Sequence, residues 1–411
     1  MKTYSVQPLD LMQFINTKYH DPFIHELLEL EGRLDSERLV KAIEQLASVF
    51  PLLKCRYDHT NNTFIENEHF SGYDLVRIDE DADRNALLTE ALDTDKKLVQ
   101  FTISTKALVI TISHMLCDGS GFKQLIYLLC ELYNGNSNEN LDYLMTREFS
   151  QLTKELTGTK AITIKMLISM MGNYKSKPIY EKNDDEDVYV LECTIPRETM
   201  SKAHALAKKQ GATLNDVFLT AYARALGKLY GLKKINIPCT VDLRKYAKDK
   251  TGIANLTGTY NLNIKMKDRI SFGETLADAS ADMQKQKKTK NDIAGPMLLV
   301  AKYEKSTLEQ FIKLYGGMET SASADYTNLG VLDDQKLAFD GATIKNAIGY
   351  SGLNKAPSFQ IAVSSFKGET TVTSLVRCGK REAEKANLII DTMVREIESF
   401  SLKMKNLHLL G

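Results

Sequence analysis

The sequence predicts an α/β (α+β) protein built from two parts of similar size. Both halves of the 411-residue chain mix the alternating pattern of strands with the spacing of amphipathic helices. A polar, acidic run at residues 179–187 lies between them, as solvated linkers do. The sequence therefore predicts a first domain at 1–178 and a second at 188–411.

Three elements are predicted in order in the first half. Residues 36–50 carry apolar side chains at helical spacing, Asp35 can cap this helix, and Pro51 ends it. Residues 98–112 alternate on both sides of a polar turn, which predicts a β-hairpin. Beyond Gly119 the helical period returns until an Asn-Gly-Asn breaker.

The second half is predicted to open with a strand at 188–195 and a helix from about 197 to 209. Thr213 with Asp216 three residues later imitates a capping box and opens a long amphipathic helix. Residues 235–241 have the pattern of a strand. The remaining predicted elements are strands near 259–266, 336–348, 358–365 and 370–377 and a last helix at about 381–400.

Composition and charge argue against several classes of protein. Lys and Arg number 53, as do Asp and Glu, so the chain lacks the basic field of a dedicated nucleic-acid binder. The six cysteines are scattered singly, which predicts reduced thiols and no metal site. The N-terminus lacks a signal-peptide layout, and the most apolar stretch, 162–171, is far shorter than the roughly 20 residues of a membrane span. We expect a cytoplasmic protein without a membrane span.

One short motif carries chemistry: His114-Met-Leu-Cys-Asp118-Gly119, at the end of the second hairpin strand. Histidine, with an ordinary pKa of about 6.5, can accept and return a proton near neutrality. Asp118 can brace the turn that aims the imidazole, and Gly119 lets the chain reverse before the helix. On these residues alone, a purely structural histidine at a turn is an equal alternative.

The pattern His114-x-x-x-Asp118-Gly119 resembles the H-H-x-x-x-D-G signature of the chloramphenicol acetyltransferase-like superfamily. This superfamily includes nonribosomal peptide condensation domains, alcohol acetyltransferases and plant-type acyl-CoA-dependent acyltransferases. Ser113 replaces the first histidine, and the D-F-G-W-G motif of the plant branch is absent. Further segments similar to landmarks of these enzymes are 30–35, 50–54, 211–217, 241–244 and 327–330. The resemblance implies two lobes, each a mixed sheet flanked by helices, with the active-site tunnel between them.

The resemblance also implies direct acyl transfer without a covalent enzyme intermediate, with His114 as the general base. It implies that Asp118 and Gly119 support the motif and do not react. Arg244, at the end of a predicted strand, is our candidate partner for Asp118, because its planar fork suits a bidentate pair. A surface arginine at a strand end is the alternative.

Other residues near these segments are less well supported as functional residues. Asn328, in a segment expected to be a loop, and Ser113 are candidates for orienting an oxyanion or lining the tunnel, and a plain loop-forming Asn328 is as well supported. Cys117 is expected to be a packed residue and not a nucleophile. The other histidines have no partner pattern and are expected at the surface: His20, His25, His59, His69, His204 and His408.

The sequence thus predicts an acyltransferase that uses acyl-CoA as co-substrate and a small alcohol or amine as acceptor, with no permanently bound cofactor. Two alternatives stay open: a stand-alone condensation enzyme using a carrier-protein thioester, and a non-catalytic relative that binds an acyl thioester. The zero net charge disfavours an acidic acyl carrier protein as partner. Since two lobes in one chain already form a cleft, a monomer is expected.

Overall fold

The computed structural model describes residues 1–18, 20–136, 141–153, 187–266, 270–316, 324–356 and 358–407. Within these ranges the protein is a mixed α/β structure of several sheets flanked by helices, which confirms the predicted class. The linker predicted at 179–187 lies outside the described residues except for Asp187, so the predicted domain bounds of 1–178 and 188–411 stay a prediction.

Before residue 154, the chain alternates short helices and strands. Its elements are β1 (Thr3–Ser5), α1 (Pro8–Ile15), η1 (Asn16–Lys18), β2 (Phe23–Gly32), α2 (Ser36–Val49), η2 (Pro51–Lys54), β3 (Cys55–Asp58), β4 (Thr63–Glu66), η3 (Gly72–Asp74), β5 (Val76–Ile78), α3 (Arg84–Thr89), β6 (Val99–Ile103), β7 (Ala107–Ser113), α4 (Gly119–Tyr133), η4 (Asp142–Met145) and α5 (Ser150–Thr153).

From Asp187 onward, the helices and strands are longer. They are β8 (Asp187–Ile195), α7 (Arg197–Lys209), α8 (Leu214–Tyr230), β9 (Lys234–Asp242), η5 (Leu243–Tyr246), β10 (Thr257–Lys265), α9 (Phe272–Thr289), α10 (Asn291–Tyr303), α11 (Leu308–Gly316), β11 (Asp325–Leu332), β12 (Ala342–Tyr350), β13 (Asn354–Lys355), β14 (Gln360–Phe366), β15 (Glu369–Cys378) and α12 (Lys380–Leu407).

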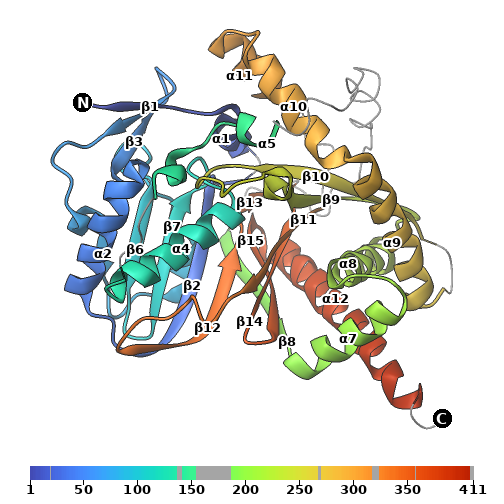
Figure 1. Cartoon of the computed structure of the whole chain (residues 1–411). Coiled ribbons are helices and arrows are strands. Elements are labelled where there is room, and N and C mark those ends of the chain that lie inside the picture. Colours follow the sequence, from blue (N-terminus) through green and yellow to red (C-terminus); the bar gives the residue numbers. More distant parts are fainter. Residues whose placement is uncertain are drawn as a thin grey trace.

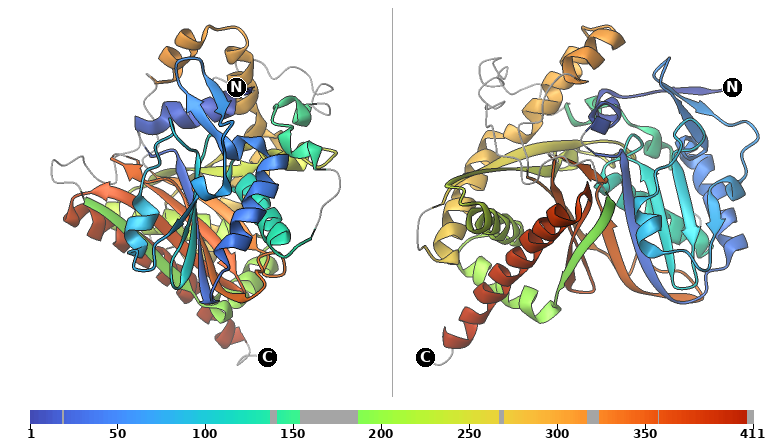
Figure 2. Two further views of the ribbon diagram at one scale, coloured as in Figure 1. Left: turned by 90° about the vertical axis from the view of Figure 1, so that its left-hand side faces the viewer. Right: turned by 180° about the vertical axis from the view of Figure 1, so that it is seen from behind.

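Two large sheets organise the molecule. In the described part of the chain, the first sheet has the strand order β12-β2-β7-β6-β5, and α2 and α4 pack together beside it (Figure 1). The second has the order β10-β9-β11-β14-β15-β13, with β8 also paired to β15. Helices α7, α8 and α12 contact one another on this second side, and α12 runs diagonally in the view from behind (Figure 2). Each sheet has its own large cluster of buried apolar side chains.

The two parts of the chain are joined through strand pairing. β12 comes from the second half, yet it pairs antiparallel with β2 along its length, from Ala342 opposite Gly32 to Tyr350 opposite His25. The first sheet therefore contains a strand supplied by the second half, which ties the halves by main-chain hydrogen bonds as well as by packing.

Most predicted elements are confirmed within one or two residues. Asp35 caps α2 by accepting from Arg38 N, and Thr213 and Asp216 form both bonds of the capping box. The strand predicted at 336–348 was wrong at its start, because residues before Ala342 turn through Gly341 (φ 87°), and β12 begins after that turn.

Two strands next to the site escaped the sequence pattern. β2 is buried on both faces over its first six residues but contains His25 and Glu26, which interrupt its apolar run. β11 was expected to be a loop at 327–330. Instead it is a strand with a bulge between Asn328 and Gly330, and the glycine has a φ of 75°.

The longest helix in the described ranges is α12, with 28 residues. It is amphipathic, and its apolar side, including Ile390, Met393 and Ile397, is buried in the second core. Among the helices of the described ranges, none is both long enough and apolar enough to traverse a bilayer.

Candidate active site

His114 lies on a tight turn between β7 and α4. We refer to residues 114–118 as the motif turn. The strand delivers His114, whose main-chain N donates to Pro22 O at 2.7 Å, and Asp118 then caps α4 by accepting from Gly121 N at 2.8 Å. The strand β7 holds the first end of the turn and the capped helix α4 holds the other, so the backbone that carries the imidazole is fixed on both sides.

The glycine required by close packing is Gly121 and not Gly119. A Cβ at Gly121 would lie 2.8 Å from Cys117 Cβ and 3.2 Å from Arg244 Nη2. A Cβ at Gly119 would make only an ordinary contact with Leu329, at 3.5 Å. The second glycine of α4 therefore allows the helix to approach the arginine beside the motif turn.

Asp118 is the anchor of the motif turn. Arg244 Nη1 lies 2.9 Å from each of its carboxylate oxygens, and the carboxylate and guanidinium side chains are only 5% and 14% exposed. Asp118 also accepts from Leu256 N at 2.7 Å and from Thr257 Oγ1 at 3.0 Å. Arg244 is thus the partner of Asp118, through the single nitrogen Nη1, because Nη2 donates instead to Ala254 O at 2.8 Å. The surface alternative for Arg244 is excluded by its burial.

The electrostatics keep Asp118 ionised. Burial alone would raise its pKa, but the Arg244 guanidinium and the donors Gly121 N and Leu256 N hold the pKa below its ordinary value. With donors on both oxygens and a favourable cation, this carboxylate is poorly suited to proton transfer. Its geometry serves to position the turn.

Asn255 assigns the tautomer of His114. The Asn255 amide Nδ2 donates to Asp10 Oδ1 and to the main-chain O of His114, both at 2.8 Å. Because these partners only accept, the amide orientation is fixed, and its Oδ1, 3.1 Å from His114 Nδ1, must accept a proton from the ring. His114 Nδ1 therefore carries the proton, and the Nε2 lone pair is left for chemistry.

A second buried ion pair supports this amide. Arg147 Nη2 lies 2.8 Å from Asp10 Oδ2, with side-chain exposures of 5% and 1%. Arg147 also donates to the main-chain O atoms of Met115, Leu116 and Ile253. Asp10, Arg147 and Asn255 were not anticipated from the sequence, and only the position of Asp10 between Leu9 and Leu11, on an apolar helix, hinted at a buried carboxylate.

The imidazole of His114 is held neutral. It is partly buried, and burial lowers its pKa below 6.5, although its own backbone, Asp118 and Asn255 act in the opposite direction. A neutral imidazole with a free Nε2 is the form that a general base requires.

Two other histidines were wrongly expected at the surface. His25 is 3% exposed and pairs with Thr111 Oγ1 at 2.9 Å, and burial lowers its pKa to about 3. His20 is partly buried, and burial lowers its pKa to about 4. His408 lies outside the described residues.

The remaining candidates have structural contacts. Asn328 lies on β11, where its Nδ2 donates to Asn215 Oδ1 at 3.0 Å and its Oδ1 accepts from Gly330 N at 2.8 Å. Ser113, the last residue of β7, is fully buried, and its Oγ accepts from Met115 N of the motif turn at 3.4 Å. Cys117 is fully buried, and burial raises the pKa of its thiol, which opposes a nucleophilic role.

No protein-family model matches the chain. Among curated proteins, 242 residues are 24% identical to a plipastatin synthase of Bacillus subtilis (strain 168), covering 53% of this chain and 9% of that protein. Tyrocidine synthase 3 of Brevibacillus parabrevis is 21% identical over 288 residues, 62% of this chain and 4% of that protein. The chain thus spans less than a tenth of the length of these relatives.

Solved structures match almost the whole chain. The trichothecene 15-O-acetyltransferase of Fusarium sporotrichioides aligns with a TM-score of 0.71 and 12% identity, over 97% of this chain and 95% of that one. The condensation domain of the monacolin K polyketide synthase aligns with a TM-score of 0.69 and 12% identity, over 98% of both chains. Polyketide synthase associated protein 5 of Mycobacterium tuberculosis aligns at 0.66 and 14% identity, over 94% and 96%. These likenesses concern the fold.

Proposed function

Because the chain has the two-lobed fold of the chloramphenicol acetyltransferase-like superfamily, we propose that it is an acyltransferase. It moves an acyl group from a thioester to the hydroxyl or amine of an acceptor. The observation that carries the proposal is the hydrogen bond between Asn255 Oδ1 and His114 Nδ1, which leaves Nε2 free to act as the base.

The chemistry needs one proton acceptor and no covalent intermediate on the protein. His114 Nε2 removes the proton from the acceptor O–H or N–H as that atom attacks the thioester carbonyl. The tetrahedral adduct then collapses with cleavage of the C–S bond, and the leaving thiolate takes the proton back from Nε2. Acyl group, proton and electron pairs balance, and the imidazole returns to its starting tautomer.

Asp118 and Asp10 act on this step indirectly. Asp118 holds the motif turn against Arg244 and the start of β10. Asp10 orients the Asn255 amide, which in turn orients the imidazole. Both are positioning residues in this proposal, since each acts on the ring through other groups.

Acyl-CoA is our first candidate for the donor, and a carrier-protein thioester is the second. The second candidate is favoured by the likeness to peptide synthases and condensation domains, since condensation domains work with carrier-protein thioesters. The first is favoured by the likeness to the acetyltransferase and by the zero net charge. A small alcohol or amine is the proposed acceptor in both cases.

The test is thiol release from a panel of acyl-CoA esters and from an acylated carrier protein, each with alcohol and amine acceptors. Replacing His114 by Ala is expected to lower kcat by about 10²–10⁴-fold. His204→Ala, which changes an exposed histidine on α7, is the matched control and should keep wild-type turnover. If His114→Ala remains folded by circular dichroism and retains full activity, His114 is not the base.

A further inference from the structure

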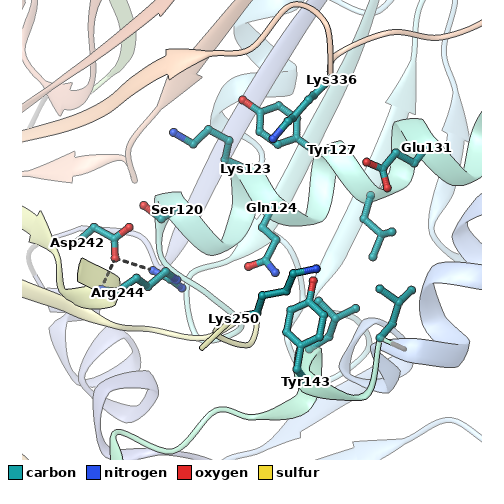
Figure 3. Close-up of a pocket in the computed structure, with 13 residues that line it drawn as sticks. Ser120, Lys123, Gln124, Tyr127, Glu131, Tyr143, Asp242, Arg244, Lys250 and Lys336 are labelled. Carbon is teal, nitrogen blue, oxygen red and sulfur yellow. Dashed lines mark hydrogen bonds and ion pairs between the residues drawn. The ribbon is translucent and has the colours of Figure 1, made fainter. Parts of the chain in front are cut away.

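A pocket of about 520 Å³ extends along α4 from the motif turn (Figure 3). Ser120, Gln124, Tyr127 and Glu131 line it from one face of this helix. Ser120 and Glu131 are eleven residue steps apart, so the lining follows roughly 16 Å of helix. Arg244, the partner of the motif aspartate, lines the end near Ser120. The pocket is therefore adjacent to the machinery that holds His114 but distinct from the imidazole itself.

Positive charge exceeds negative charge in this pocket. Its charged lining residues are Lys123, Lys250, Lys336, Arg244, Asp242 and Glu131. Even when the charge of Arg244 is assigned to its buried partner Asp118, the three lysines outnumber the two carboxylates. A chain whose total charge is zero thus gathers a local positive surplus beside its motif turn.

The lysines keep donors available for a ligand. Lys250 Nζ lies 5.4 Å from the centroid of the Tyr143 ring, and Lys336 Nζ lies 5.5 Å from that of Tyr127. A cation over an aromatic face keeps its charge and its N–H groups. Lys123 uses one donor on Leu329 O, at 2.9 Å. Three ammonium groups in one concave site with two aromatic rings suit an anion of phosphate type.

We propose that this pocket binds the phosphate end of a phosphopantetheine thioester donor, with Lys250 and Lys336 as its principal contacts. The inference rests on the proposed function, because both candidate donors carry a pantetheine arm esterified to phosphate. The pocket is elongated and ends beside the motif turn, which suits an extended arm anchored by its phosphate. Coenzyme A and a carrier-protein prosthetic group share this chemistry.

The experiment is a calorimetric titration of the full chain with CoA, dephospho-CoA and phosphate-free pantetheine. CoA is expected to bind more tightly than pantetheine, and Kd is expected to rise with ionic strength. The double variant Lys250→Ala/Lys336→Ala should weaken CoA binding roughly tenfold and leave the Kd for pantetheine close to wild type. Equal affinities of the wild type for CoA and pantetheine would overturn the proposal.

Lys2→Ala with a second exposed lysine, Lys209→Ala, is the matched control, because it removes the same charge away from the pocket. Lys2 Nζ also lies over a tyrosine, 5.2 Å from the Tyr4 ring centroid. This control should bind CoA like the wild type. A control that weakens CoA as much as the pocket variant would show a general effect of net charge and would refute the site.

Turnover distinguishes the two donor sources and separates this inference from the function. For each phosphate-bearing donor, acyl-CoA or an acylated carrier protein, kcat/KM is divided by kcat/KM for an acyl-pantetheine donor. The pocket variant should lower this ratio for at least one of the two, and the donor whose ratio falls further is the one that the pocket serves. Activity with an unchanged ratio would refute the pocket and keep the acyltransferase. Phosphate-dependent binding without thiol release would keep the pocket and refute the acyltransferase.

Discussion

Two buried ion pairs hold the motif turn, and they differ in the groups that they contact. Asp118 and Arg244 bind the main chain at the start of α4 and in the segment before β10. Arg147 binds the main chain of the motif turn and of that same segment, and Asp10 holds the amide that contacts the imidazole. The first pair therefore fixes where the histidine is, whereas the second also fixes which nitrogen of the ring is free.

Both pairs meet on five consecutive residues that end at the first residue of β10, which we call the clasp segment, 253–257. Its members contact one pair or the other, so the segment couples them. The contacts are Ile253 O with Arg147, Ala254 O with Arg244, Asn255 Nδ2 with Asp10, Leu256 N with Asp118 and Thr257 Oγ1 with Asp118. A change in one pair is thus transmitted through one short stretch of the second half.

The largest expected effect is on stability. Arg147→Met should lower the free energy of unfolding by about 3–5 kcal/mol, because it leaves a buried carboxylate and three buried carbonyls without their cation. Arg244→Met should cost less, since Asp118 keeps Gly121 N, Leu256 N and Thr257 Oγ1. Urea unfolding of both variants measures the difference.

An equal loss in the two variants would show that the remaining donors on Asp118 do not compensate for its cation. A larger loss in Arg244→Met would reverse the ranking and make the motif aspartate the more dependent of the two carboxylates. The urea m-value should be unchanged in both variants, which shows that the comparison concerns the native state.

The next effect is on turnover. Asn255→Ala should lower kcat roughly 10- to 100-fold, because the imidazole loses the acceptor that fixes its tautomer. Thr257→Val removes a side-chain donor from the Asp118 carboxylate and changes no contact of the His114 ring. It should lower the free energy of unfolding by about 1 kcal/mol and leave kcat nearly unchanged.

Steady-state kinetics of the two clasp variants test this division. If Thr257→Val reduces kcat as strongly as Asn255→Ala, the two ion pairs act as one unit and the distinction drawn between them is wrong. If neither variant changes kcat, the tautomer of His114 does not depend on the clasp segment.

The Asp118 side of this comparison could be anticipated from sequence, whereas the Asp10 side could not. His114, Asp118 and Arg244 lie at the ends of predicted strands, in a spacing that a turn and a helix start impose. Arg147 and Asn255 lie outside such patterns, between elements, and meet the motif only through the tertiary fold. Arg147 and Asn255 reach Asp10 across 137 and 245 positions, and no local periodicity marks either residue.

Elements were missed for a related reason. A strand is predicted from alternating polar and apolar residues or from an apolar run. In β2 the buried polar residues His25 and Glu26 interrupt both patterns. In β11 the bulge at Gly330 places turn residues inside a strand. Both strands flank the site, so the irregular residues that prevented their prediction also shape the site.

The smallest expected effect is on the pH dependence of kcat/KM. Variants on the Asp10 side and on the Asp118 side should shift it in opposite directions. Because burial lowers the pKa of His114, the neutral base persists below the ordinary value of about 6.5, and the acid limb of kcat/KM should lie below that value. The bond from Asn255 raises this pKa, so Asn255→Ala should move the limb to lower pH. Arg244→Met leaves the charge of Asp118 uncompensated, and since that charge also raises the pKa of His114, the limb should move to higher pH. A pH–rate profile of each variant checks the signs, and a shift in the same direction for both would contradict the separate roles of the two pairs.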